Sequence, residues 1–201
     1  MPRSVIPPAT VARLPLYLQC LERLEHSQGT VSSQELAHIA HVNSAKVRKD
    51  LSYLGSYGVR GVGYEVDHLA FQIRTELGLM RDWNVVIVGM GNLGSALSNF
   101  GGFPERGFRI VGLYDIDRAK IGKKVDGLAI RHISDLPADV EAHNVSIGLI
   151  TTPAGAAQET LELLSEAGVR SILNFAPAVL SSPDTVELRN VDLSTELQIL
   201  S

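Results

Sequence analysis

The stretch Val85-Val86-Ile87-Val88-Gly89-Met90-Gly91-Asn92-Leu93-Gly94 decides the fold. Its four leading apolar residues predict a strand that is buried on both faces, as in a parallel sheet. The glycines that follow are spaced G-x-G-x-x-G, and the apolar spacing after them predicts a helix that begins at about Asn92. In such a turn the first glycine permits the tight bend, the second lets a pyrophosphate approach the backbone, and the third lets helix and strand pack closely. The helix N-terminus then offers free N–H groups to phosphates.

An acidic residue follows at the distance that a dinucleotide site requires. A second apolar strand over residues 110–114 ends in Asp115, which lies 21 residues past Gly94. A carboxylate there accepts hydrogen bonds from the adenine ribose and repels a 2′-phosphate, so the pattern favours NAD(H) over NADP(H). The alternative is a glycine turn of an α/β domain that binds no ligand, and the strand, helix and acid together weigh against it.

Length and composition bound the class of protein. The 201 residues allow one large domain or two small ones. No apolar run reaches the roughly 18 residues of a membrane span, and the N-terminus lacks the apolar segment of a signal peptide. The single cysteine, Cys20, is predicted to be a small buried hydrophobe. These features predict a cytoplasmic protein with no membrane partner.

Charge is distributed unevenly along the chain. The net charge is −4, but residues 1–78 carry +1 and the remainder carries −5. Within residues 43–64 four cations face one acid, which gives +3. A basic segment on an acidic protein is a candidate footprint for nucleic acid.

The N-terminal part has the pattern of a helix-turn-helix. Apolar spacing predicts a first helix over residues 9–26, a short second helix that Ser32 and Glu35 begin as a capping box, and a third over residues 44–54. A further helix is expected to be capped by Asp67. A tight turn before the third of three short helices is typical of this DNA-binding motif.

The third helix and the segment after it carry the expected DNA contacts. Val47, Leu51 and Leu54 form a narrow inward stripe, so cations and hydroxyls on the other face suit phosphates and base edges in a major groove. Residues 55–64 hold four glycines and predict a hairpin or wing, whose tip residue reaches a minor groove or a phosphate. The alternative for the helix is a solvated basic face. The predicted DNA-binding residues are Ser44, Lys46, Arg48, Lys49, Ser52, Tyr53 and Arg60.

The rest of the chain continues a doubly wound pattern. Strands are predicted over residues 128–130, 145–150, 169–173 and 186–188, with helices over 154–167 and after Asp192, and a solvated charged loop over 120–124. Ligands in such sheets bind at the carboxyl ends of the strands, where residues 151–153 and 174–177 lie, and Phe100 and Phe103 are candidates for the wall of the same pocket. The predicted cofactor-binding residues are Gly89, Met90, Gly91, Asn92, Leu93, Gly94, Asp115, Thr151, Thr152, Pro153, Asn174, Phe175, Ala176 and Pro177.

The joint pattern resembles the redox-sensing repressor family called Rex. The matching stretches span nearly the whole chain in family order. They are Arg13-Leu14-Pro15-Leu16-Tyr17-Leu18, Val47-Arg48-Lys49-Asp50-Leu51-Ser52-Tyr53, Gly61-Val62-Gly63-Tyr64, the glycine stretch, Asn174-Phe175-Ala176-Pro177 and Val191-Asp192-Leu193. Jointly they are highly specific, although each alone is not.

The resemblance implies a fold and a mode of action. It implies an N-terminal winged helix (1–79), a Rossmann-type doubly wound parallel sheet (80–190) and a C-terminal helix (191–201) that is swapped onto the partner of a homodimer. Such proteins bind inverted-repeat operators and leave them when NADH binds, whereas NAD+ favours the bound form. The resemblance also implies that Arg13 and Asp192 link one subunit to the other. Phe100 stands where some relatives carry tyrosine, so a redox trigger there lacks its hydroxyl.

The leading hypothesis is therefore a DNA-binding repressor that senses the NADH/NAD+ ratio, with no metal and no enzymatic activity. The rival is a small NAD-dependent dehydrogenase with a helical appendage, which needs a general acid–base beside the nicotinamide. His132 and His143 are not expected at the carboxyl end of a strand beside that ring. A third reading is a Rossmann domain for another nucleotide, such as coenzyme A.

Overall fold

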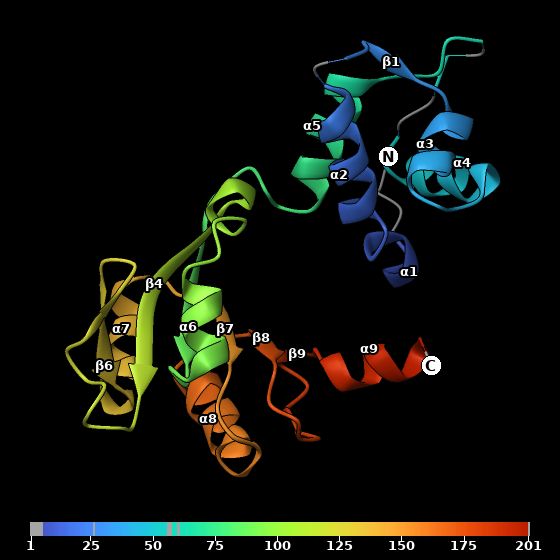
Figure 1. The fold of residues 1–201 in the computed structure, drawn as a ribbon. Helices are drawn as coiled ribbons and strands as arrows, with labels where there is room; N and C mark the ends of the chain where they lie inside the picture. Colours follow the sequence, from blue (N-terminus) through green and yellow to red (C-terminus); the bar gives the residue numbers. More distant parts are fainter. Residues whose placement is uncertain (1–5, 26, 56–57, 60, 201) are drawn as a thin grey trace. The chain divides into compact units, whose positions relative to one another are not determined.

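The computed structural model describes residues 6–25, 27–55, 58–59 and 61–200, apart from the side chains of Leu193 and Glu196. The chain divides into two compact units, residues 1–81 and 82–201, which we describe one at a time. Figure 1 shows the elements of both units in chain order.

The first unit combines short helices with a small antiparallel sheet (Figure 1). Strand β1 pairs with β2, and a bridge between Val59 and Gly63 closes the hairpin before β2. The helix–turn–helix and the hairpin that follows confirm the predicted winged arrangement. The elements are α1 (Pro8–Val11), α2 (Leu14–Leu24), β1 (Thr30–Val31), α3 (Ser33–Ile39), α4 (Ser44–Tyr53), β2 (Tyr64–Glu65) and α5 (Val66–Glu76).

The prediction of a single first helix over residues 9–26 was wrong. The chain forms α1 and α2 with a break at Ala12 and Arg13, because Pro15 lies in the first turn of α2. A proline ring clashes with the carbonyl four residues earlier and donates no hydrogen bond, so it begins a new helix rather than continuing the old one.

The predicted helix starts are partly confirmed. The Ser32 hydroxyl accepts the Glu35 N–H at 3.1 Å, as a capping box requires. The Glu35 carboxylate, however, accepts from the Gln28 amide at 2.9 Å. The prediction that Asp67 caps α5 was wrong, because the N-cap lies two residues earlier, at Glu65, and makes no side-chain cap.

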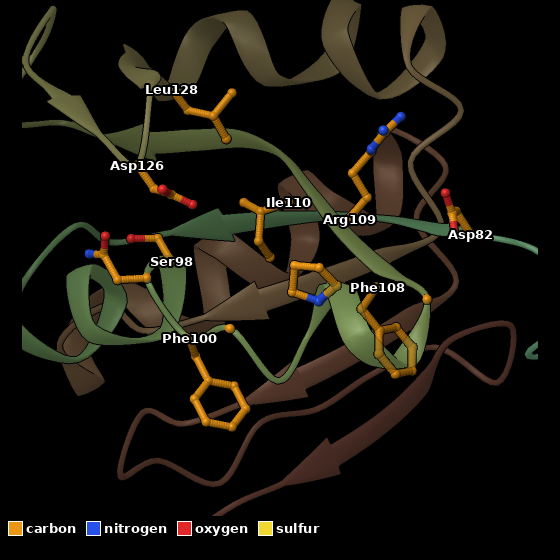
Figure 2. A pocket seen from close by; sticks show the side chains of 12 residues that line it. Asp82, Ser98, Phe100, Phe108, Arg109, Ile110, Asp126 and Leu128 are labelled. Atoms are coloured by element: carbon orange, nitrogen blue, oxygen red, sulfur yellow. The ribbon is translucent and has the colours of Figure 1, made fainter.

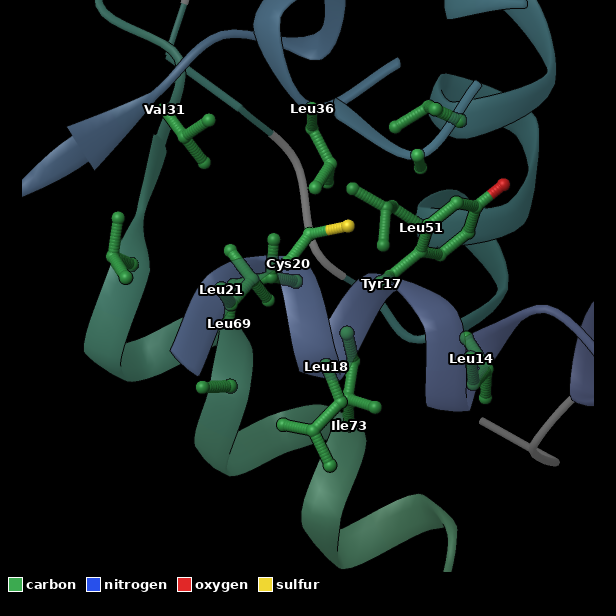
Figure 3. Packing of buried hydrophobic residues seen from close by; sticks show 14 of the residues in the cluster. Leu14, Tyr17, Leu18, Cys20, Leu21, Val31, Leu36, Leu51, Leu69 and Ile73 are labelled. Atoms are coloured by element: carbon green, nitrogen blue, oxygen red, sulfur yellow. The ribbon is translucent and has the colours of Figure 1, made fainter. Parts of the chain in front are cut away.

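One apolar cluster holds the first unit together. Tyr17 of α2 and Leu51 of α4 are fully buried in it (Figure 3). Cys20 is also buried, and burial raises the pKa of its thiol, which confirms its role as a small hydrophobe. The largest fully buried side chains of this cluster are Leu14, Tyr17, Leu21, Leu36, Leu51, Leu69 and Ile73.

The turn between α3 and α4 contains a residue in a left-handed conformation. His41 has φ of +50° and is exposed. We expect His41→Gly to stabilise the protein by about 0.5–1 kcal/mol, because a residue with a Cβ is strained at positive φ. Thermal unfolding checks this, with His41→Ala as the control that removes the imidazole but keeps the strain. Equal effects of both substitutions would contradict it.

The second unit is a doubly wound sheet with strands in the order β5-β6-β4-β3-β7-β8-β9. Setting aside β5, this is the order 3-2-1-4-5-6 of dinucleotide-binding domains, with all neighbours parallel. The strands are β3 (Trp83–Val88), β4 (Phe108–Asp115), β5 (Lys124–Val125), β6 (Leu128–His132), β7 (Ile147–Ile150), β8 (Ser171–Asn174) and β9 (Glu187–Asn190). The helices are α6 (Asn92–Ser98), α7 (Leu136–Ala142), α8 (Ala154–Glu166) and α9 (Leu193–Ile199), with 3-10 turns at Pro104–Arg106 and Ile133–Asp135.

Strand β3 is buried on both faces, as its sequence predicts. Val86 and Val88 pack against the cluster that holds residues of α7 and α8. Val85 and Ile87 pack on the opposite face with Met90 and Leu113. The glycine turn therefore leaves the sheet at its centre, at the switch point where β3 lies between β4 and β7.

The solvated loop predicted over residues 120–124 is partly strand. Lys124 and Val125 form β5, which pairs antiparallel with β6. Asp126 and Gly127 connect them at φ of +47° and +79°, which is the two-residue turn that an Asp-Gly pair favours. Two-residue strands are too short to show a period in sequence.

Within the described residues, no helix is long and apolar enough to cross a membrane. The same residues contain no cluster of three or more histidine, cysteine, aspartate or glutamate side chains suited to a metal ion.

Candidate functional site

The three glycines of the turn differ in what surrounds them. Gly89 has φ of +100°, and a Cβ there would lie 2.7 Å from the amide nitrogen of Thr152. A Cβ on Gly94 would collide with the carbonyl oxygen of Gly89 and lie 2.9 Å from the Thr151 hydroxyl. A Cβ on Gly91, by contrast, would meet nothing within 4 Å. The protein itself thus requires glycine at 89 and 94, while the open space at Gly91 is what a ligand needs.

Asp115 ends β4 and is 7% exposed. Its Oδ2 accepts from the Met90 N–H at 2.8 Å and from Lys120 Nζ at 2.9 Å, and its Oδ1 accepts from the Asp117 N–H at 2.9 Å. Burial alone would raise the pKa of Asp115, but these three donors lower it, so the carboxylate is ionised. Because a carboxylate offers about four acceptor positions, capacity for a ribose hydroxyl remains.

A crevice of about 810 Å³ opens at the carboxyl ends of the strands. It lies where doubly wound sheets bind their ligands, and it runs past the glycine turn and Asp115. The sequence-predicted residues that line it are Gly89, Gly91, Leu93, Asp115, Thr151, Thr152, Pro153, Phe175 and Pro177.

The other predicted cofactor residues do not line this crevice. Met90 and Ala176 are buried in apolar clusters, Gly94 packs under the turn, and Asn92 is exposed in the first turn of α6. Asn174 is 1% exposed and shapes the site from behind. Its Oδ1 accepts the Ala176 N–H at 2.9 Å and its amide donates to the Asn190 side chain at 2.9 Å. Asn174 therefore fixes the loop that carries Phe175 and Pro177.

Sequence reasoning missed one wall of the crevice. Lys120 was assigned to a solvated edge, yet it pairs with Asp115. Its spacing of five residues beyond the acid was the available signal. The polar face of α8 and two isoleucines were missed because helical periodicity marks the face toward the core, not the face toward a ligand. The missed lining residues are Val88, Ile116, Asp117, Lys120, Ile133, Ala156, Glu159, Thr160, Glu162, Leu163 and Glu166.

The hydrogen bonds of the two threonines after β7, Thr151 and Thr152, indicate whether the crevice suits a dinucleotide. The Thr151 hydroxyl donates to the carbonyls of Gly89 at 2.7 Å and Val88 at 3.0 Å, and so ties this loop to the glycine turn. The neighbouring Thr152 lines the crevice, and its buried hydroxyl is the one such side-chain atom in the described part of the chain without a hydrogen-bond partner. A buried hydroxyl without a partner at a crevice wall indicates a polar ligand. Together with the open space at Gly91, it fits a nucleotide.

Phe100 does not line this crevice. It is 52% exposed and lines a second cavity of about 470 Å³ with Ser98, Arg109, Ile110 and Asp126 (Figure 2). Phe103 contacts it edge to face with centroids 5.2 Å apart and packs toward the core. The sequence left open a pocket wall or an ordinary core position for each ring. Neither ring lines the crevice, and Phe103 takes the core position.

The histidines were placed incorrectly in one respect. His132 does end a strand, β6, where it pairs in register with Asp115, and its Nδ1 lies 2.9 Å from the Ser134 hydroxyl. It therefore lies beside the acid predicted to bind the adenine ribose. His143 follows α7 as its C-cap.

The outer face of α4 presents the predicted cations. Lys46, Arg48 and Lys49 are exposed, whereas Val47 and Leu51 on the inward face of the same helix are fully buried. The other predicted contacts on α4 are the exposed Ser52, whose hydroxyl bonds the Lys49 carbonyl, and the partly exposed Ser44 and Tyr53. The predicted contact at Arg60 lies outside the described residues.

The residues assigned to coupling between subunits have partners of their own. Arg13 forms a bidentate pair with Asp50 of α4 at 2.7 Å for both bonds. This hydrogen bonding raises the pKa of the Arg13 guanidinium. Asp192 is the N-cap of α9, where it accepts from the Ser194 N–H and the Thr195 hydroxyl, both at 2.9 Å. The link between Arg13 and Asp192 concerns a second copy and stays a prediction.

An α/β unit with a dinucleotide crevice at its switch point, joined to a winged helix whose recognition helix exposes cations, defines a DNA-binding regulator with a nucleotide-binding domain. Comparison with known proteins agrees. The family model "CoA binding domain" matches residues 80–178, and "Putative DNA-binding protein N-terminus" matches residues 5–52. The redox-sensing transcriptional repressor Rex of Streptomyces avermitilis is 61% identical over 98% of this chain and 78% of its own length. The chain belongs to the Rex family of redox-sensing transcriptional repressors.

Solved structures of RSP, a Rex-family repressor, share the fold. RSP in complex with NAD+ and operator DNA matches with a TM-score of 0.92 at 33% identity, covering 98% of this chain and 91% of that one. RSP in complex with NADH matches with a TM-score of 0.88 at 32% identity, covering 98% and 93%.

Proposed function

We propose that this protein is a transcriptional repressor that binds inverted-repeat operators as a homodimer, senses the NADH/NAD+ ratio and is released from DNA by NADH. The observation that carries the proposal is the match of 98% of the chain, in both units, to a repressor solved with NAD+ and operator DNA and also with NADH. Family membership makes NADH and NAD+ its cofactors and double-stranded DNA its partner.

Sensing requires that the two oxidation states favour different arrangements of the protein. A ligand shifts such an equilibrium only by the difference in its affinity for the two arrangements. Reduced nicotinamide is neutral and puckered, whereas oxidised nicotinamide is planar and cationic. An apolar lining such as Phe175 and Pro177 favours the neutral ring, because burying a charge is costly. We infer that NADH binds more tightly than NAD+.

The test is selection of binding sites from a random DNA pool, followed by affinity measurements on the selected duplex with saturating NADH or NAD+. We expect NADH to weaken DNA binding and NAD+ to leave it intact. Equal effects of both oxidation states on the selected duplex would refute redox sensing.

Asp115 is expected to hold the adenine ribose. Asp115→Ala should weaken NADH binding about tenfold or more, since a hydrogen bond to a charged group is worth about 1.5–3 kcal/mol. DNA affinity without cofactor should not change. Calorimetric titration measures the first quantity, and Asp184→Ala, an exposed acid of the same unit outside the crevice, is the matched control for charge. Unchanged NADH binding would remove Asp115 from the ribose site.

The purified protein can also be tested for two other functions, which are dehydrogenase activity and binding of coenzyme A. We propose that it is not an enzyme, so NADH should not be consumed in the presence of small alcohols or keto acids. The match to a model described as a CoA binding domain gives coenzyme A as a specific competing ligand. A competition experiment with bound NADH decides between NADH and coenzyme A as the ligand. Displacement of NADH by an equal concentration of coenzyme A would favour coenzyme A.

The remaining features of the proposal follow from operator binding. A two-fold symmetric DNA site matches a two-fold symmetric dimer. The exposed Leu197, Ile199 and Leu200 of the C-terminal segment suit a helix that packs on a second subunit. We assign residues 1–79 to DNA binding, 80–190 to the cofactor and 191–201 to the swapped helix. We also propose a cytoplasmic location for this DNA-binding role, in which no step calls for a metal.

A further inference from the structure

A buried acid lies on the recognition helix, on the side away from the predicted DNA contacts. Asp50 is 1% exposed and is adjacent to Leu51 and three residues from Val47, both fully buried. A carboxylate in an apolar stripe is costly unless donors surround it. Replacing such an acid together with its partners by apolar side chains of similar volume is often neutral or stabilising. The acid therefore indicates a role other than stability, which apolar packing would not fulfil.

Four donors surround the carboxylate of Asp50. Its Oδ1 accepts from the Thr10 hydroxyl at 2.8 Å and from Arg13 Nη2 at 2.7 Å. Its Oδ2 accepts from Arg13 Nε at 2.7 Å and from the Tyr17 hydroxyl at 2.8 Å. Thr10 lies on α1, Arg13 is the N-cap of α2, and Tyr17 lies within α2. The ring of Tyr17 packs in the core of the unit (Figure 3). Both oxygens are thus saturated from two other helices.

This arrangement restricts the rotation of α4 in a way that its apolar contacts do not. Apolar contacts are non-directional, whereas hydrogen bonds weaken steeply when they are bent, and a bidentate arginine fixes the plane of its carboxylate. A rotation of about 20° about the axis would move a side chain at the helix surface by roughly 2 Å. Such a shift would break the Asp50 bonds and would also move the predicted DNA contacts Arg48 and Ser52, which are on the same helix.

We propose that Asp50 is a positioning residue for operator recognition, since its grip by Thr10, Arg13 and Tyr17 sets the rotation of α4 and hence the register of the DNA-facing side chains. The proposal rests on the function proposed above. It separates specificity from general affinity: phosphate contacts by flexible lysines tolerate a small rotation, whereas contacts to base edges do not.

The test compares operator and random-sequence DNA at one salt concentration, without cofactor, on the full chain. We expect Asp50→Asn to lower the ratio of operator to random-DNA affinity about tenfold, with random-DNA affinity changed less than about twofold. Tyr17→Phe removes one of the four donors and keeps the ion pair, so a smaller fall of about two- to threefold in the ratio is expected. If Asp50→Asn does not fold, Tyr17→Phe decides.

Two further variants separate positioning from stability. Arg74→Gln breaks the pairs that Arg74 makes with Glu22 and Glu25 at 3.1 Å, within the same unit but away from α4. It should lower the thermal midpoint without changing the affinity ratio. The quadruple substitution Thr10→Val, Arg13→Met, Tyr17→Phe and Asp50→Leu leaves no buried donor of this cluster without a partner, so it should recover stability but not the ratio.

The outcomes distinguish the two levels of the proposal. A wild-type ratio in Asp50→Asn, or in Tyr17→Phe where that variant decides, would overturn the positioning role and leave the repressor function standing. A wild-type protein with no preference for any selected duplex would overturn the repressor function, and the positioning role with it.

Discussion

Gly91→Ala is expected to weaken NADH binding about 100-fold, or about 2.7 kcal/mol, while the protein stays folded and binds DNA without cofactor as before. The reason is the open space at this residue. A Cβ on Gly91 meets no protein atom within 4 Å, so the substitution costs the fold little, but the methyl group would occupy the space through which a pyrophosphate approaches the backbone. Calorimetric titration with NADH and thermal unfolding measure the two effects.

Two other glycines are the controls for this prediction. Gly155, in the first turn of α8, also has open space and does not line the crevice, so Gly155→Ala should leave NADH binding unchanged. Gly94→Ala should destabilise the second unit, because its Cβ would collide with the Gly89 carbonyl. Normal NADH affinity in Gly91→Ala would place the pyrophosphate away from the glycine turn.

The different environments of these glycines explain how much of the site could be predicted from sequence. The spacing of Gly89, Gly91 and Gly94 constrains the local backbone, so the strand, turn and helix follow from a short stretch of chain. The same holds for Asp115, because the end of β4 is set by its own apolar run. The side-chain pairs that organise the site could not be predicted from the sequence, because they form only in the folded chain. Lys120 reaches Asp115 only through the turn that residues 117–120 form.

Asp50 shows the same limit in the first unit. The wheel of α4 predicted a stripe of Val47, Leu51 and Leu54, and Asp50 projects on the same side of the helix, between Val47 and Leu51 in sequence. From the sequence, Asp50 was used only in the net charge of residues 43–64 and in the stretch that resembles the family, and a lone acid is usually solvated. Its partner Arg13 lies 37 residues away in the chain, so local periodicity does not reveal the pair. A charge on an apolar stripe is the available sign that a distant partner exists.

The second prediction concerns the cations of α4. Replacing Lys46, Arg48 and Lys49 together with alanine should weaken DNA binding at about 0.1 M salt by at least 100-fold, because each lost phosphate contact forfeits the release of a counterion. The slope of log affinity against log salt should flatten by about 2.7, or about 0.9 for Lys49→Ala alone. Alanine favours helix, and the three residues are exposed, so the fold should persist.

The matched control removes the same charge from the second unit. Arg118, Lys123 and Lys124 are exposed near the β5 edge, and their triple alanine variant should change neither affinity beyond about twofold nor the slope. Equal losses in both triple variants would mean that DNA affinity depends on the net charge of the protein and not on the cations of α4.

A comparison with random-sequence DNA distinguishes two kinds of contact. Loss of a phosphate contact weakens binding to all duplexes alike, whereas loss of a base contact weakens binding to the selected operator only. A loss confined to the operator would therefore assign the α4 cations to base edges, and a uniform loss would assign them to the backbone.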